Sequence, residues 1–379
     1  MKRHILSRLC FLCCIVAVCL LASCKEKANQ GRTTAVRVGA ILPMTGTAAN
    51  YGELMKRGID IAMDEYNTTT AQAHPKLEVI IEDSKSNPKD GVSAMQKLLQ
   101  IDNVPVVMPA LSSVVLACAP IAEQNRVVLL NCPANSPKLR AAGQFIFNIA
   151  LLSDQESEFL ADYAFNKMAA RSVGIFFVNN ESGRGYRDSF AAKFTAMGGV
   201  VRLSEGHEQG ATDFRTIIEK LRAAQVDLIF LTSYYSESAL FLRQAKELGF
   251  RSKWLSYASV ETPDFLKLAG DAAEGLIYSQ PGFDVNGSDE LTKRFVGEFR
   301  KRYGQDPDFW SAQFFEGTRL LGAAVNSGAA TGEAIRDYLA QLKDFRGITG
   351  EVSFDKKGCV TRVVRFKTVT PDGFKYLTD

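Results

Sequence analysis

The sequence predicts an α/β protein made of two doubly wound lobes with a cleft between them. Apolar runs typical of buried strands alternate with helix-length amphipathic segments, and this rhythm occurs twice along the chain. Short polar turns follow several of the apolar runs, as they do at the carboxyl edge of a parallel sheet. The chain has 379 residues, more than one domain usually holds, so two lobes are expected.

Residues 1–23 have the features of a lipoprotein signal peptide. Three basic residues precede an apolar core, from Leu9 to Ala22, that is too short for an ordinary membrane span. The core ends in Leu-Ala-Ser-Cys, which matches the bacterial lipobox. We therefore expect cleavage before Cys24, a diacylglyceryl group on its sulfur and a polar tether over residues 24–35. The alternative is a plain secretory peptide with an incidental cysteine.

Charge and cysteine content exclude several classes of protein. The net charge of +3 equals the three basic residues of the signal, so the remaining chain is neutral and nucleic acid is not an expected partner. Beyond Cys24, only Cys118, Cys132 and Cys359 remain, which is neither a disulfide framework nor a zinc motif. Cys118 and Cys132 could bond to each other, or both could be buried thiols.

The first unit is expected to alternate strands and helices from the tether onward. Its predicted elements are strands at 36–42, 77–82 and 104–108, helices at 52–66 and 88–101, then a further helix and strand before residue 133 and a short strand at 145–149. Strands joined by helices of this length imply right-handed βαβ units and a parallel sheet.

The second unit repeats this pattern. Its predicted elements are helices at 155–169, 185–197, 214–223 and 237–248, and strands at 172–178, 200–204, 226–231 and 253–257.

The last hundred residues are expected to complete both units. They contain three helical segments, and residues 351–354 and 362–368 are predicted to pair as an antiparallel hairpin around a Lys-Lys-Gly turn. We expect residues 36–150 and 278–344 to form lobe 1, and residues 151–277 and 345–379 to form lobe 2. The chain would then cross between lobes more than once, which predicts a hinge and a ligand cleft.

Two polar turns between Val106 and Ser136 are the first candidates for a binding site. The turn at Ser112 and Ser113 opens a helix, and the turn from Pro133 to Ser136 follows the next strand. Both lie at the predicted carboxyl edge, where hydroxyls and free helix N–H groups suit an anion such as a carboxylate. The alternative is that Ser112 or Ser113 is only a helix N-cap.

Signatures of enzymes are absent from the sequence. It contains no G-x-S-x-G elbow and no phosphate-binding loop, and the Ser182-Gly183-Arg184-Gly185 turn lacks the third glycine of a dinucleotide site. We therefore predict a protein that is not an enzyme and that needs no cofactor or metal.

The combined features resemble the type I periplasmic binding proteins of the Leu/Ile/Val-binding class, the substrate-binding components of ABC transporters for branched-chain amino acids. The resemblance covers about residues 36–370 and rests on motifs such as VRVGAILPMTGTAANYG, EDSKSNPKDGV, VVMPALSS and LRQAKELGF. It implies a ligand site between the lobes. The residues it assigns to that site are Tyr51, Ser112 with Ser113 beside it, Ala134, Ser136 and Tyr234.

The resemblance also implies specific roles and two departures from the family pattern. Ser112 and Ser136 would hold a ligand carboxylate, and Tyr51 and Tyr234 would line and close the cleft. Ser182 stands where the family often has a tyrosine, and Ala258 stands at or near the acid that accepts a ligand ammonium. Because a buried ammonium needs a partner, a neighbouring acid such as Glu261 or Glu181 would substitute, or the ligand lacks an α-amino group.

The sequence thus predicts a lipid-anchored solute-binding protein on the outer side of a bacterial cell membrane, with ABC permease subunits as partners. The expected ligand is a branched-chain or other hydrophobic amino acid, with an aromatic or aliphatic carboxylate as the alternative. A ligand sensor for a signalling partner is a third possibility, since receptor ectodomains share this fold.

Overall fold

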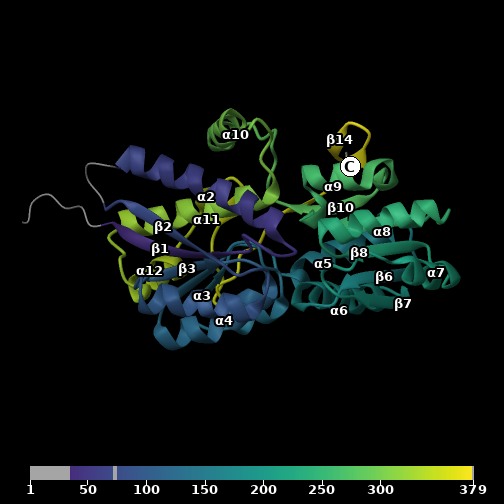
Figure 1. Ribbon diagram of the computed structural model, residues 1–379, viewed down its shortest axis with the longest axis horizontal. Coiled ribbons are helices and arrows are strands. Elements are labelled where there is room, and N and C mark those ends of the chain that lie inside the picture. Colours follow the sequence, from purple (N-terminus) through teal and green to yellow (C-terminus); the bar gives the residue numbers. More distant parts are fainter. Residues whose placement is uncertain (1–34, 71–74, 378–379) are drawn as a thin grey trace, which may run out of the picture.

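The computed structural model describes residues 35–70 and 75–377 and shows two α/β lobes lying side by side (Figure 1). The predicted fold class is confirmed. The predicted signal peptide, the lipid site at Cys24 and the tether as far as residue 34 lie outside the described residues.

Lobe 1 is built on a five-stranded parallel sheet in the order β2-β1-β3-β4-β5. Its strands are β1 (Val36–Leu42), β2 (Leu77–Asp83), β3 (Val106–Pro109), β4 (Val128–Asn131) and β5 (Ile146–Asn148). The helices that follow these strands are α2 (Ala49–Thr70), α3 (Pro88–Gln100) and α4 (Ser112–Asn125). The central strands β3 and β4 are fully buried along their length because helices cover both faces of the sheet.

Three further helices of lobe 1 come from the last hundred residues: α10 (Glu290–Tyr303), α11 (Phe309–Asn326) and α12 (Gly332–Gln341). Helix α11 is buried along nearly its whole length and packs along α2. The two backbones approach closely at Gly58, where a Cβ atom would lie 2.0 Å from the carbonyl oxygen of Ser311. Glycine is therefore required at this contact.

Lobe 2 is built on a seven-stranded mixed sheet in the order β14-β13-β10-β9-β8-β6-β7. Its parallel strands are β6 (Ser172–Val178), β7 (Val200–His207), β8 (Leu228–Thr232), β9 (Lys253–Tyr257) and β10 (Ile277–Pro281). The antiparallel strands are β13 (Val364–Thr370) and β14 (Gly373–Tyr376). The helices are α5 (Ser153–Asp162), continued by one π-helical turn at 163–167, α6 (Glu181–Ala196), α7 (Arg215–Ala223), α8 (Tyr235–Glu247) and α9 (Pro263–Ala269).

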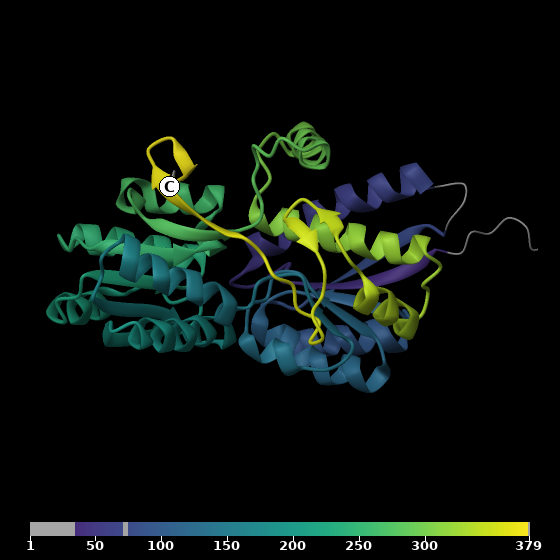
Figure 2. The same ribbon diagram turned by 180° about the vertical axis from the view of Figure 1, so that it is seen from behind.

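The chain crosses between the lobes three times. The first crossing follows β5, the second follows β10, and the third precedes β13. In Figure 2 the third crossing is the yellow segment that runs from lobe 1 to the second sheet. Three crossing segments allow the lobes to rotate against each other while remaining connected.

The predicted C-terminal hairpin is wrong, because the two strands pair with other strands and not with each other. Strand β12 (Gly350–Val352) pairs with β11 (Phe345–Gly347), whereas β13 pairs with β10 and β14. Local alternation identified the strands, but the register is decided by the sheets that each strand joins.

Residues 345–360 pack on lobe 1, although the sequence prediction places them in lobe 2. Phe354 stacks edge-on against Phe147 of β5, and the Asn148 N–H donates to the Gly358 carbonyl at 2.7 Å. We therefore propose that lobe 1 also includes residues 345–360. The other predicted lobe boundaries stay a prediction.

Candidate functional site

The carboxyl ends of the strands in the two sheets face each other across the junction between the lobes. The loops after β1, β3 and β4 come from lobe 1, and those after β6, β8 and β9 come from lobe 2. Ligands of open α/β sheets bind at such edges, because the adjoining helices begin there and their first N–H groups are free.

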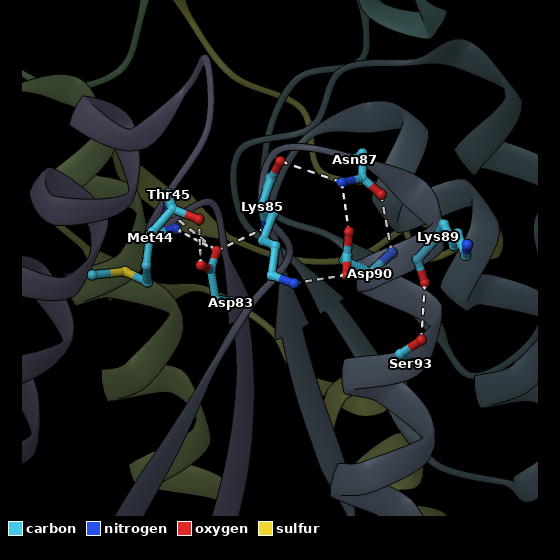
Figure 3. Close-up of polar contacts among 8 residues, drawn as sticks. All are labelled: Met44, Thr45, Asp83, Lys85, Asn87, Lys89, Asp90 and Ser93. Carbon is cyan, nitrogen blue, oxygen red and sulfur yellow. Dashed lines mark hydrogen bonds and ion pairs between the residues drawn. The ribbon is translucent and has the colours of Figure 1, made fainter.

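The loop after β1 is held in place by the Asp83 carboxylate at the end of β2. Asp83 accepts hydrogen bonds from the Met44 N–H at 3.0 Å, the Thr45 hydroxyl at 2.6 Å and the Lys85 N–H at 2.7 Å, and Figure 3 shows these contacts. Burial acts to raise the Asp83 pKa, but these hydrogen bonds outweigh it and the pKa is lowered. The loop therefore presents the start of α2, which carries Tyr51, in a defined position.

The hydroxyl of Ser112 organises the turn after β4. It accepts from the N–H groups of Asn135 and Ser136 at 3.2 and 3.3 Å, and it lies 3.4 Å from the Asn135 side-chain oxygen. Helix α4 starts at Ser112 after Leu111, whose φ is 68°, and no side chain caps the helix. The N-cap interpretation of Ser112 and Ser113 is therefore wrong.

The remaining predicted residues of lobe 1 have different surroundings. The Ala134 carbonyl accepts from the Asn131 amide at 2.7 Å, which closes the turn. Ser136 is fully buried, and its hydroxyl has no hydrogen-bond partner among the described residues. Ser113 is partly exposed and is not among the residues that line the central cavity.

Asn135 joins the two lobes. Its side-chain oxygen accepts from the Ser182 hydroxyl of α6 at 2.8 Å, and its amide donates to the Tyr186 hydroxyl at 3.4 Å. Ser182 thus contacts Asn135, which the sequence analysis did not select, while a contact of Ser182 with the ligand stays a prediction. Tyr186 is one turn further along α6, so the i, i+4 spacing from Ser182 could have identified it.

Tyr51 forms a second bridge between the lobes. Its hydroxyl donates to the Ser259 carbonyl at 3.1 Å and accepts from the Tyr235 N–H at 2.9 Å, both in lobe 2. Its ring lies 5.8 Å from the ring of Tyr234, whose hydroxyl accepts from the Asn180 amide at 3.1 Å. The structure thus brings Tyr51 and Tyr234 together at the junction between the lobes.

Replacing Tyr51 with phenylalanine is expected to destabilise the closed arrangement by about 1–3 kcal/mol, because the buried Tyr235 N–H loses its partner. Small-angle X-ray scattering should then give a larger radius of gyration than wild type. Tyr338→Phe, on α12 and away from the junction, is the control and should leave the radius unchanged. Equal radii for Tyr51→Phe and wild type would show that this bridge does not hold the lobes together.

A cavity lies at the centre of the junction and has a volume of about 10 Å³, enough for about one water molecule. Four of its lining residues are aromatic: Tyr186, Tyr257, Phe309 and Trp310. Ala258 also lines the cavity, and its contact with a ligand stays a prediction. An amino acid needs more room than this, so the lobes must part before such a ligand can enter.

Glu156 is the acidic residue that lines this cavity, and the sequence analysis missed it. It lies in the first turn of α5, is 3% exposed and accepts hydrogen bonds from the hydroxyls of Tyr186 and Ser279. Burial raises its pKa to about 7, while the two hydrogen bonds act in the opposite direction. An acid in the first turn of a helix usually faces solvent, so its position alone gave no signal.

The two acids proposed from sequence as substitutes are already paired with cations. Glu261 forms a buried ion pair with Lys367. Glu181 contacts Lys138 at 3.0 Å and Arg184 at 3.1 Å. Neither lines the cavity, so in this arrangement neither acid is placed to replace the missing one near Ala258.

Cys118, Cys132 and Cys359 are buried free thiols, so the possible bond between Cys118 and Cys132 is not formed. Within residues 35–70 and 75–377, no cluster of His, Cys, Asp or Glu is arranged to hold a metal ion. The helices of those same residues include none with the length and apolar character of a membrane span.

Fold and site define a class of two-lobed proteins with a binding site at the junction. A family model described as periplasmic binding protein matches residues 35–373, and the chain belongs to this family. The predicted resemblance is confirmed. A curated relative is the leucine-, isoleucine-, valine-, threonine- and alanine-binding protein of Pseudomonas aeruginosa, 25% identical over 327 residues, which cover 85% of this chain and 86% of the relative.

Solved structures share the fold over nearly the whole chain. The leucine-binding protein LivK of Thermotoga maritima superposes with a TM-score of 0.84 at 25% identity, covering 91% of this chain and 98% of that one. A solute-binding protein of an ABC transporter from R. palustris, in complex with 4-hydroxybenzoate, superposes with a TM-score of 0.82 at 21% identity. The match covers 90% of this chain and 96% of that one. The second likeness concerns the fold alone.

Proposed function

We propose that this chain is the extracytoplasmic solute-binding component of an ABC importer. It closes its two lobes around a small carboxylate ligand, for which a branched-chain or other hydrophobic amino acid is the first choice. The observation that carries this proposal is the cavity between the facing strand ends, whose aromatic and aliphatic lining residues suit an apolar side chain. The relatives named for leucine and similar amino acids support the ligand class.

The carboxylate is proposed to bind at the turn after β4. The buried Ser136 hydroxyl has no partner among the described residues and is available to donate. Ser112 orders the same turn through two backbone N–H groups, and its own proton is only weakly engaged at 3.4 Å from Asn135. Entry of the ligand requires the contact between Asn135 and Ser182 to break.

Attachment and partners rest on the sequence. Lipid at Cys24 would tether the protein to the outer face of a membrane, and the closed lobes would dock on permease subunits. A sensor that reports ligand to a signalling partner would use the same closure.

A carboxylate without an α-amino group is the second candidate ligand. Ala258 lines the cavity where the family resemblance implies an acid for the ammonium group, and this observation favours an aromatic or aliphatic acid. The 4-hydroxybenzoate complex shows that a protein of this fold accepts such a ligand.

A thermal-shift screen tests the proposal. L-Leucine, L-isoleucine, L-valine and L-phenylalanine are compared with 4-methylpentanoate, 3-phenylpropanoate and 4-hydroxybenzoate. A ligand at a hundred times its Kd should add about 2.7 kcal/mol to the free energy of unfolding. We expect at least one hydrophobic amino acid to raise the melting temperature. If only the acids without an amino group do so, the second candidate is correct. If no compound of either series does so, the proposal fails.

A further inference from the structure

We infer that Glu156 binds the ammonium group of the ligand and thereby selects α-amino acids over carboxylates without an amino group. This inference rests on the proposed function and assigns a residue to the role that Ala258 lacks the chemistry to fill. Glu156 lies on α5, just after the first crossing, whereas Ala258 follows β9. The same cavity is lined by both residues.

The hydrogen bonds of Glu156 leave it capacity for a further donor. One carboxylate oxygen accepts from Tyr186 and the other from Ser279. Each oxygen has two lone pairs, so each retains one acceptor position. No lysine, arginine or histidine of the described chain forms an ion pair with Glu156 or contributes to its pKa shift. A buried carboxylate without a countercharge is costly, and a ligand cation would supply that charge.

Hydrogen-bond donors that could bind a ligand carboxylate lie at or beside the same cavity. Trp310 lines the cavity, is 6% exposed, and its ring N–H has no partner among the described residues. The buried hydroxyl of Ser136 is also unpartnered there and follows directly on the cavity residue Asn135. Free donors suit a ligand carboxylate, while the free acceptor positions of Glu156 suit an ammonium. Together they match the zwitterion of an α-amino acid rather than a simple acid.

A purely structural role for Glu156 is the competing explanation. Its two hydrogen bonds tie α5 to α6 and to β10, which would by itself account for a buried acid. Such a role predicts that removing the charge affects all ligands alike. A role in ammonium binding predicts an effect that depends on the amino group of the ligand.

Proton linkage gives a second readout. The Glu156 pKa lies at about 7 without ligand, and an ammonium would lower it by favouring the carboxylate. The titratable side chains that face Glu156 are Tyr186 on α6 and Tyr257 on β9, and burial raises the pKa of both, so both stay neutral. Amino acid affinity should therefore rise as the pH increases to about 7 and level off above it, with protons released on binding below that pH.

The test is isothermal titration calorimetry with matched ligand pairs: L-leucine with 4-methylpentanoate, and L-phenylalanine with 3-phenylpropanoate. Glu156→Gln should weaken binding of each amino acid by roughly 30-fold or more relative to the matched acid without an amino group. This is the effect expected when a buried charge pair loses one member. Proton release at pH 6, measured in buffers of different ionisation enthalpy, should disappear in the variant. In the double variant Glu156→Gln with Ala258→Glu, selectivity for the amino acids should return.

Asp154→Asn is the matched control. Asp154 lies in the same helical turn as Glu156, but its carboxylate contacts Arg140 and does not line the cavity. The control variant should leave selectivity unchanged. If Glu156→Gln weakens both members of each pair equally, or neither, the inference is wrong while the proposed function stands. If wild type binds no compound of either series, the proposed function fails and this inference fails with it.

Discussion

Arg362→Met is expected to lower the free energy of unfolding by roughly 3–5 kcal/mol, because it leaves a buried carboxylate without its countercharge. The Arg362 guanidinium contacts the Glu316 carboxylate of α11 at 2.5 Å, and the two side chains are 2% and 0% exposed. Arg362 also donates to the carbonyls of Ile149 and Glu351 at 3.3 and 3.1 Å. It therefore joins the third crossing to the first crossing and to lobe 1.

Urea denaturation measures the change in the free energy of unfolding, and two further variants test whether the change comes from the unpaired Glu316 charge. Arg365→Met removes an exposed partner of Asp284, with side chains 54% and 21% exposed, and should cost at most about 1 kcal/mol. Adding Glu316→Leu to Arg362→Met should recover much of the lost stability, since the unpaired charge is then gone. A single Arg362→Met variant as stable as Arg365→Met would show that this ion pair does not hold the hinge region.

Glu156→Gln is expected to stabilise the ligand-free protein at alkaline pH by up to about 3 kcal/mol, although it weakens amino acid binding. The Glu156 pKa is raised from an ordinary value near 4.5 to about 7 in the folded protein. The stabilising contribution of Glu156 to the free energy of unfolding is therefore fully present below pH 4.5 and is lost as the pH rises through 7. Glutamine does not titrate, so the variant avoids this loss.

The measurement is the free energy of unfolding of wild type and variant from pH 5 to pH 8. The difference should grow in favour of the variant across this range. Asp308, whose pKa burial raises to about 6, titrates in both proteins and cancels in the comparison. Parallel pH profiles for the two proteins would contradict the raised pKa of Glu156. A stability gain that accompanies a loss of selectivity is the pattern expected of a residue kept for binding.

The contacts at the closed junction predict that ligand selectivity and lobe closure are linked. Asn135 of lobe 1 forms hydrogen bonds with the hydroxyls of Ser182 and Tyr186 in lobe 2, and the Tyr186 hydroxyl in turn donates to Glu156. A ligand that enters must replace the contacts of Asn135. Its ammonium and carboxylate then have to satisfy the same side chains, so a ligand lacking either group closes the lobes less well.

Much of the fold could be predicted because its signals are local. The alternation of apolar runs and amphipathic helices identified both lobes, and the turn after the third strand placed Ser112 near the junction. Tyr51, Tyr234 and Ala258 were placed there by the family resemblance. The pairing of the C-terminal strands could not be predicted, because β13 joins a sheet whose other strands lie far away in sequence.

The site was only partly predictable for the same reason. Asn135 was passed over as a turn residue, Glu156 as an ordinary acid of a first helical turn, and Trp310 as part of an apolar helix. Each becomes a cavity residue only when elements separated by more than a hundred residues pack together. Glu261 and Glu181 looked available in the sequence but are engaged by Lys367 and by Lys138 and Arg184.

By itself, the sequence determined the fold class and the edge of each sheet at which a ligand site should form, because these depend on periodicity and on turns that follow strands. The family was identified separately, from the resemblance of its motifs. The tertiary structure alone decided which side chains share the cavity and which acids remain unpaired. Hydrogen bonding and burial are properties of three-dimensional neighbours. Glu156 obtains its raised pKa and its free acceptor positions from Tyr186, Ser279 and the surrounding apolar wall, none of which is adjacent to it in the chain.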